Sequence, residues 1–206
     1  MNQQTFDFGY GPVPAHHHPN GGGWVADSAY VADTAYVGPE AWVFGEARVF
    51  DQARVFDQAW VFDQAWIYGE AQVYGEARVY GKARVFGEAT VIDQAQVSGN
   101  SQIFDQAQVF GEAWIFGEAW VFDHARVFGE ARVFDQARVF DRARVSSEAT
   151  VIDQAQVFGE AWVSGEARVF DQAQVFQKAQ VSGEARVYGE AWVFGDAQLF
   201  EGDHHA

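Results

Sequence analysis

The chain has 206 residues, of which 49% are hydrophobic and 17% aromatic, and its formal net charge at pH 7 is -16. This composition is too apolar for a disordered chain. The negative charge excludes nucleic acid as an expected partner, because affinity for a phosphate backbone depends on Lys and Arg. The sequence contains no cysteine, which excludes disulfides and thiolate metal sites. We expect one folded domain or one elongated repeat array.

Residues 1–23 are rich in Pro, Gly and His and differ from the rest of the chain. They contain no basic segment followed by an apolar one, so a secretory signal is not predicted. No apolar run approaches the length of a membrane span. Two compartments remain as alternatives: the extracellular space, if the protein is exported by another route and forms a fibre there, and the cytoplasm. The stretch "TFDFGY" alternates like a short strand, so we expect residues 1–23 to cap the first repeat or to link to a neighbouring copy.

A six-residue repeat fills the chain from residue 24 to residue 200. An aliphatic residue stands at every sixth position from Val25 to Leu199, thirty times in all. Alanine precedes it by two positions, except at Gly23 and Ser101. Residues two apart on a strand share a face, so the Ala and the aliphatic residue are predicted to point into one core. Residues 201–206 follow as a short polar tail.

Two folds have this spacing. Hairpins of four-residue strands would need Asn-Gly or Asp-Gly corners, whereas the corners here are mostly Gly-Glu or Asp-Gln. Such a sheet would also leave its valines uncovered. A coil of three hexads instead closes a triangle around the Ala and Val side chains and pairs each strand in parallel with the coils above and below. The sequence therefore predicts an all-β, single-stranded parallel β-helix with 18 residues per coil and about ten coils.

The stretch "VYGEARVYGKARVFGEA" at residues 73–89 resembles the hexapeptide-repeat left-handed β-helix superfamily, in particular uncharacterised bacterial and phage proteins with V-Y-G-N-A-R-type hexads. The resemblance covers residues 24–200 and implies left-handed coils. It also implies that an enzyme of this type, an acyltransferase or a γ-type carbonic anhydrase, would carry a histidine near an inserted loop or three histidines around a metal between subunits.

The histidines of this chain do not fit that pattern. No loop is inserted in the repeat, and the one histidine inside it, His124, stands at a corner, where we interpret it as a solvated substitute for Gln. His16, His17 and His18 precede the repeat, and His204 and His205 follow it, without a scaffold that would fix zinc geometry. We therefore expect no catalytic residues. Weak metal binding by the histidines, and an enzyme site held in residues 1–23, remain as alternatives.

The corner dipeptides show a restraint on charge. At most corners Gly or Asp, which tolerate a positive φ, comes first, and Glu follows Gly, as at Gly45-Glu46, whereas Gln follows Asp, as at Asp51-Gln52. One corner departs from this restraint with a column of glutamates, one in each successive coil, comprising Glu112, Glu130, Glu148, Glu166 and Glu184. Carboxylates about 4.8 Å apart could share Ca²⁺. The alternative is a solvated acidic edge, partly offset by Arg132, Arg168 and Arg186. No other cofactor is expected.

The residues that flank each valine point outward, and on the second face those after the valine are aromatic in nine successive coils. This column comprises Phe50, Tyr68, Phe86, Phe104, Phe122, Phe140, Phe158, Phe176 and Phe194. On the third face the equivalent column becomes Ser146, Ser164 and Ser182. Stacked aromatic ladders can fix the register within the chain. An aromatic strip of this length also exceeds the apolar patch that a soluble monomer usually exposes, which predicts lateral contacts.

These features favour a structural protein that assembles with itself, head to tail, into filaments. The tail "EGDHHA" is too short and too polar to lay a helix over the last coil, so the C-terminal end is predicted to be open. The expected axial contact joins the last coil of one copy to the first coil of the next through Val25, Val31, Val37, Val187, Val193, Leu199 and Phe200. The alternative is a binding module whose aromatic face holds a protein or a glycan.

Overall fold

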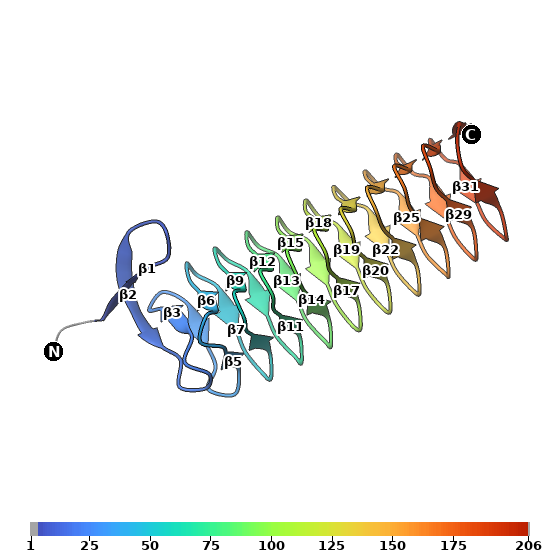
Figure 1. Ribbon diagram of the computed structural model, residues 1–206. Helices are drawn as coiled ribbons and strands as arrows, with labels where there is room; N and C mark the ends of the chain where they lie inside the picture. Colours follow the sequence, from blue (N-terminus) through green and yellow to red (C-terminus); the bar gives the residue numbers. More distant parts are fainter. Residues whose placement is uncertain (1–3, 206) are drawn as a thin grey trace.

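The computed structural model describes residues 4–205, which form a β-solenoid of three long sheets without helices (Figure 1). Each turn of the solenoid contributes one short strand to each sheet, and the corresponding strand of the next turn pairs with it in parallel, as Trp66 does with Arg84. The first sheet has 13 strands, and the second and third have ten each. The prediction of a parallel β-helix with about ten coils is confirmed.

The strands are short and recur in the same order in every turn. The first sheet contains β1 (Thr5–Asp7), β2 (Pro12–His17), β3 (Trp24–Ala26), β6 (Trp42–Val43), β9 (Trp60–Val61), β12 (Arg78–Val79), β15 (Gln96–Val97), β18 (Trp114–Ile115), β21 (Arg132–Val133), β24 (Thr150–Val151), β27 (Arg168–Val169), β30 (Arg186–Tyr188) and β33 (Asp203–His205). The second contains β4 (Tyr30–Val31), β7 (Arg48–Val49), β10 (Trp66–Ile67), β13 (Arg84–Val85), β16 (Gln102–Ile103), β19 (Trp120–Val121), β22 (Arg138–Val139), β25 (Gln156–Val157), β28 (Gln174–Val175) and β31 (Trp192–Val193). The third contains β5 (Tyr36–Val37), β8 (Arg54–Val55), β11 (Gln72–Val73), β14 (Thr90–Val91), β17 (Gln108–Val109), β20 (Arg126–Val127), β23 (Arg144–Val145), β26 (Trp162–Val163), β29 (Gln180–Val181) and β32 (Gln198–Leu199).

The core consists of the alanines and aliphatic residues of the repeat. Val79, for example, pairs with Val61 in the coil before and with Val97 in the coil after, and all three are fully buried. The two exceptions to the alanine rule have local reasons. Ser101 is buried, and its hydroxyl donates to the Ser98 carbonyl at 2.7 Å. A Cβ on Gly23 would lie 2.3 Å from the Gly38 carbonyl oxygen, so only glycine fits there.

From Gly45 to Gly195 each corner begins with a residue of positive φ, whereas the corners of the first coil, at residues 27, 33 and 39, do not. Asp51 has φ 60° and Gly69, in the next coil, has φ 72°. The Asp side chain also has a second role, because the Asp51 carboxylate accepts a hydrogen bond from the Gly69 N–H at 3.1 Å. The same contact recurs at other corners, for example from Gly189 to Asp171 at 3.0 Å. Corner aspartates therefore tie one coil to the next.

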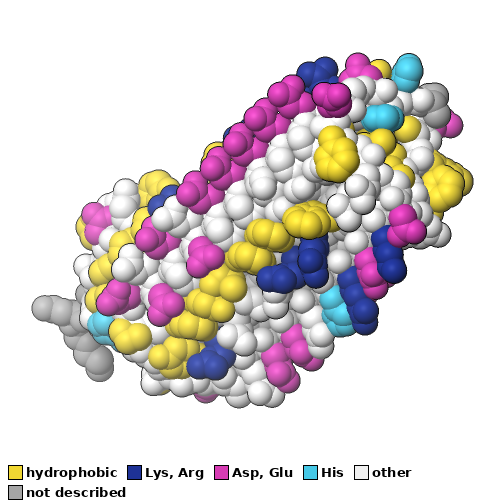
Figure 2. All heavy atoms as spheres, turned by 45° about the vertical axis from the view of Figure 1, so that its right-hand side comes forward, with side chains coloured by type: hydrophobic (Ala, Val, Ile, Leu, Met, Phe, Trp, Pro, Cys, Tyr) yellow, Lys and Arg dark blue, Asp and Glu magenta, His cyan; other side chains and the backbone are white. Residues whose placement is uncertain are grey.

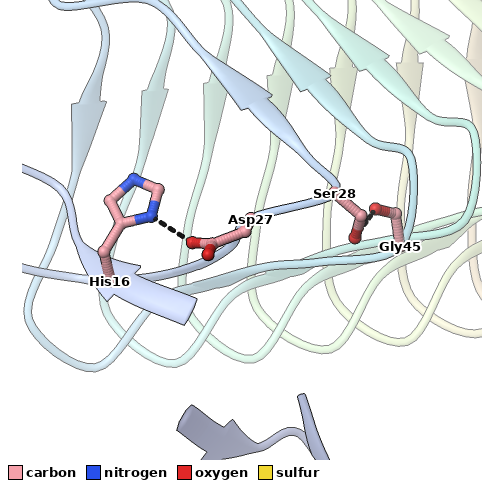
Figure 3. Close-up of polar contacts among 4 residues, drawn as sticks. All are labelled: His16, Asp27, Ser28 and Gly45. Atoms are coloured by element: carbon pink, nitrogen blue, oxygen red, sulfur yellow. Dashed lines mark hydrogen bonds and ion pairs between the residues drawn. The ribbon is translucent and has the colours of Figure 1, made fainter. Parts of the chain in front are cut away.

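The N-terminal segment folds over the first coil of its own chain. Strands β1 and β2 form an antiparallel hairpin, and β2 pairs antiparallel with β3. His16 Nδ1 lies 2.8 Å from Asp27 Oδ1, at the corner where the Ser28 hydroxyl donates to the Gly45 carbonyl at 2.6 Å (Figure 3). Beside the hairpin, the Val37 N–H donates to the Asn20 carbonyl, so the edge of the third sheet is covered as well.

The C-terminal tail forms a strand. Strand β33 pairs in parallel with β30, with Val187 opposite His204, and so lengthens the first sheet by one strand. The second and third sheets end at β31 and β32, which have a neighbour on one side only. The first sheet likewise ends at β33, whose one neighbour among the described residues is β30, so all three sheets present an open strand edge at the C-terminal end. Residues 4–205 contain no helix that could cross a membrane.

Candidate interaction surfaces

The aromatic column of the second sheet is a stack of rings. Centroids of successive rings lie 4.9 Å apart between Phe86 and Phe104 and again between Phe104 and Phe122, with the planes within 3° of parallel. The side chains are half-buried along the column, and only at its end does Phe194 become exposed. The rings therefore cover one another, which leaves a narrower apolar strip than the sequence pattern suggests.

The environment of Tyr68 reflects this partial burial. Its ring stacks between Phe50 and Phe86, at 5.2 and 4.7 Å. Burial raises the pKa of the Tyr68 phenol above its ordinary value, and the positive charge of Arg84 partly offsets that rise. The column thus has the environment of a stabilising ladder within the chain.

The third sheet changes character along the axis. Its N-terminal part carries stacked rings, such as Phe110 and Phe128 at 4.8 Å, whereas Ser146 follows in the next coil. The Trp162 indole N–H donates to the Ser146 hydroxyl at 3.0 Å. Figure 2 shows a hydrophobic band along the rod and a row of acidic side chains along an edge. The faces are therefore not equivalent.

A groove of about 830 Å³ lies on the second sheet, near the N-terminal end. At its centre the Trp66 ring stands between two guanidinium groups, with Arg48 Cζ and Arg84 Cζ each 5.2 Å from the ring centroid. Lys82 lines the same groove, and Glu46 accepts a hydrogen bond from Gln64 at 3.1 Å. Among residues 4–205, neither arginine nor the lysine forms an ion pair. The result is a positive groove on an acidic protein.

Sequence reasoning missed this groove. The arginines and Trp66 precede the buried aliphatic residues of β7, β10 and β13, whereas the prediction concentrated on the residues that follow them. The signal was the order Arg48, Trp66, Arg84 at the same hexad position in three successive coils. Strand pairing places these three side chains in register on one sheet.

The glutamate column lies at the corner between the third sheet and the first. All five side chains are exposed, and none forms an ion pair within the described chain. Two of the three arginines expected to offset them lie over aromatic rings instead, Arg132 over Trp114 at 5.8 Å and Arg168 over Phe170 at 5.9 Å. In residues 4–205 no group of three or more His, Asp or Glu side chains could hold a metal ion. The column is an acidic ridge along the rod.

The described histidines do not converge on a common metal site. His124 is an exposed corner residue. His17 packs against the Trp24 ring, with centroids 3.9 Å apart. His18 is buried, and Asn20 N–H donates to its Nδ1 at 3.2 Å. The terminal histidines belong to β33, where His205 lies 5.1 Å from the Tyr188 ring. The contacts of His17, His18 and His205 are thus packing and hydrogen-bonding contacts within the fold.

The residues expected to form the axial contact differ in exposure. Val25 and Val37, at the first coil, are covered by the N-terminal segment, and Val187 is covered by β33. Val31 and Leu199 remain partly exposed, Val193 is 7% exposed and Phe200 60% exposed. A hollow of about 610 Å³ at the C-terminal end is lined by Val193 and Leu199 together with Trp192, Phe194 and His204.

The fold and these surfaces define a β-solenoid repeat protein. A family model described as YdcK Beta solenoid repeat matches residues 71–86 and 179–195. The first match spans β11 to β13 and the second reaches from Ala179 to Gly195, so the chain is similar to that family in two separate turns of the solenoid. None of the curated proteins matches the chain.

Proposed function

We propose that this protein is a structural rod that joins further copies end to end, rather than an enzyme. The observation that carries the proposal is where apolar side chains are exposed. Eight large hydrophobic side chains are exposed among the described residues, and six of them belong to the two ends. These six are Tyr10 (82%), Val13 (39%) and Tyr30 (58%) at the N-terminal end, and Trp192 (64%), Phe194 (54%) and Phe200 (60%) at the C-terminal end.

The shapes of the two ends favour a head-to-tail contact. At the C-terminal end β33 projects beyond β31 and β32, which leaves the hollow beside it. At the N-terminal end the β1–β2 hairpin projects beyond β4, the open edge of the second sheet. In the proposed joint, the hairpin of one copy enters the hollow of the next and covers its Trp192 and Phe194. A contact of this kind between unlike ends propagates as a filament.

This joint differs from the one that the sequence predicts. Val25 and Val37 are already covered by their own chain, so they are not available to a neighbour. Their place is taken by Tyr10 and Val13 of the hairpin. Residues 4–23 then cap the first coil and also provide the surface that seals the joint.

The test combines sedimentation velocity with negative-stain microscopy of the purified chain. We expect filaments one rod wide that lengthen with protein concentration. Replacing Trp192, Phe194 and Phe200 with Ser should shorten them to single rods. The matched control replaces Trp114 and Trp162, which are exposed in the middle of the rod, and should leave filament length unchanged.

A second variant separates head-to-tail joints from joints between two C-terminal ends. Tyr10→Ser with Val13→Ser changes only exposed hairpin side chains. It should shorten filaments as strongly as the C-terminal variant. Assembly that stops at pairs and is insensitive to the hairpin variant would contradict the head-to-tail joint. A chain that remains a single rod at the highest concentration would overturn the proposed function.

A further inference from the structure

The basic groove on the second sheet shares Tyr30 with the N-terminal end, but its cations take no part in the proposed end joint, and their chemistry points to a carboxylate ligand. Arg48, Lys82 and Arg84 gather three positive charges, while the one acidic residue in the groove, Glu46, is hydrogen-bonded to Gln64. The net charge of the protein is -16, but these three cations have no acidic partner in the described part of the chain. An anionic ligand can therefore replace the water around them with charge-assisted hydrogen bonds.

The position of Trp66 decides which kind of anion fits. Both of its faces carry a guanidinium group at 5.2 Å, so the ring is not free to stack on a sugar or a base. Among residues 4–205 neither guanidinium group donates to a hydrogen-bond or ion-pair partner, so the N–H groups of both remain available to a ligand. The N–H edges of a guanidinium group bind carboxylates in a fixed, planar geometry. The groove is therefore suited to a row of carboxylates rather than to a flat ring.

The chain itself carries such a row on its opposite side. Each turn contributes one strand to each of the three sheets, which form the sides of a triangle in cross-section. The corner between the third and first sheets therefore lies opposite the second sheet. That corner holds the acidic ridge, whose five glutamates are exposed and unpaired among residues 4–205. Its backbone is tied from coil to coil, as by the Glu148 N–H to the Gly165 carbonyl at 3.0 Å.

We propose that the acidic ridge of one copy binds in the basic groove of a second copy, side by side. The contact rests on the proposed function, in that both are self-association, but it uses none of the residues of the end joint. Arg48 and Arg84 of one copy bind glutamates from the middle of the ridge, such as Glu130 and Glu166, and Lys82 binds a third.

The two surfaces share one axial period, which makes the contact repeatable. Arg48 and Arg84 are two coils apart, and so are Glu130 and Glu166. At about 4.8 Å per coil both pairs span about 9.6 Å. Two rods with parallel axes can therefore place each guanidinium group opposite a carboxylate without distorting either solenoid. The match follows from identical coil spacing in the two copies.

Groove and ridge lie on opposite sides, so each copy has one partner on each side. A contact between unlike surfaces that does not close into a ring continues indefinitely. The groove lies in the N-terminal half of the rod and the ridge in the C-terminal half. Parallel neighbours are therefore staggered along the axis, and the product is a flat, staggered array of rods.

Charge reversal tests the contact. Arg48→Glu with Arg84→Glu should abolish lateral pairing, and Glu130→Lys with Glu166→Lys should do the same. Mixing the two variants should restore pairing, because each supplies the surface that the other has lost. The control, Arg126→Glu with Arg144→Glu, makes the same change of net charge on the third sheet and should leave pairing intact.

Cysteine crosslinking reads the contact directly, since the chain has no cysteine of its own. Gln64→Cys in the groove and Glu148→Cys in the ridge should form a mixed disulfide when the two proteins are mixed under oxidising conditions. Cysteine at Gln108, on the third sheet, is the matched control and should not crosslink to either.

The outcomes separate this contact from the end joint. Absence of the crosslink and no loss of pairing on charge reversal would overturn the lateral contact, even if filaments one rod wide persist. Crosslinked pairs that survive Trp192→Ser with Phe194→Ser would support it, even if the end joint fails. Rods that never pair but bind polygalacturonate, with affinity lost in Arg48→Glu, would assign the groove to an acidic glycan and overturn the proposal.

Discussion

The substitution Val109→Asp tests the register of the whole solenoid. Val109 lies in the middle of the rod on β17, between Val91 and Val127 of the neighbouring coils, and is fully buried. Its neighbour on the same strand, Gln108, is exposed. A slip of one residue would exchange the two environments, because side chains alternate between the faces of a strand.

The expected loss of stability is large. Removing a buried Val side chain forfeits about 1.5–3 kcal/mol of apolar burial. Burying a polar group without a hydrogen-bond partner costs a further 2–7 kcal/mol, roughly. The sum, about 4–10 kcal/mol, is comparable to the whole stability of a typical domain, about 5–15 kcal/mol. We expect the coils around β17 to unfold.

The control variants separate charge from shape. Val109→Asn introduces a group of similar size that does not titrate. Burial raises the pKa of the carboxyl introduced by Val109→Asp above its ordinary value of about 3.9. Above that pH the unfolded chain binds fewer protons at this group than the folded chain does, so the stability lost relative to Val109→Asn should increase as the pH rises. Gln108→Asp should change stability little at any pH.

Thermal melting by circular dichroism gives the overall effect, and hydrogen exchange locates it. Stability in a solenoid is a sum of repeats and their contacts with neighbours, so protection should be lost first in β14, β17 and β20. Unchanged melting of Val109→Asp would refute the assigned core. Greater damage from Gln108→Asp than from Val109→Asp would show that the register is wrong by one residue.

The interior of the rod was predictable because a fixed period leaves few choices. With an aliphatic residue at every sixth position, only one face of each strand can be buried, and the structure buries it throughout the middle coils, as at Val61 and Val139. The positive φ at corners such as Asp51 also follows from the residue types. Both features depend on contacts that the same repeat supplies in every turn.

The ends were less predictable because they break the repeat. The hairpin strand β2 contains Pro12 and Pro14, which argue against a central strand. Pro14 is tolerated because it takes part through its carbonyl, which accepts from the Asp27 N–H at 2.9 Å. Strand β33 is polar and pairs through its backbone, so hydrophobicity gives no sign of it. These strands form through backbone hydrogen bonds, so the amino-acid composition of the two segments does not predict them.

Of the candidate surfaces, the aromatic column was visible in the sequence but its degree of exposure was not. Exposure depends on how neighbouring rings cover one another, which the order of residues does not specify. The groove needed two columns to be considered together, the strand residues around Trp66 and the corner residues around Lys82. The two columns stand two residues apart along the chain, and their side chains gather into one groove only when successive coils stack in register.

Two further predictions concern the ridge and the ladder. Because residues 4–205 gather no group of three acidic or histidine side chains, Ca²⁺ and Mg²⁺ at millimolar concentration should raise the melting temperature equally, by screening the glutamates. A rise specific to Ca²⁺ that Glu148→Gln removes would instead indicate a calcium site. The ladder prediction replaces Phe104, Phe122 and Phe140 with Ser. These rings stack 4.9 to 5.0 Å apart and are half-buried, so their loss should lower the melting temperature while the rod stays folded, since none belongs to the Ala and Val core. The crosslink between positions 64 and 148 should form as before, because the ladder lies outside the residues proposed to bind the ridge. Unchanged melting together with loss of lateral pairing would show that the ladder, and not the basic groove, is the surface on which neighbouring rods meet.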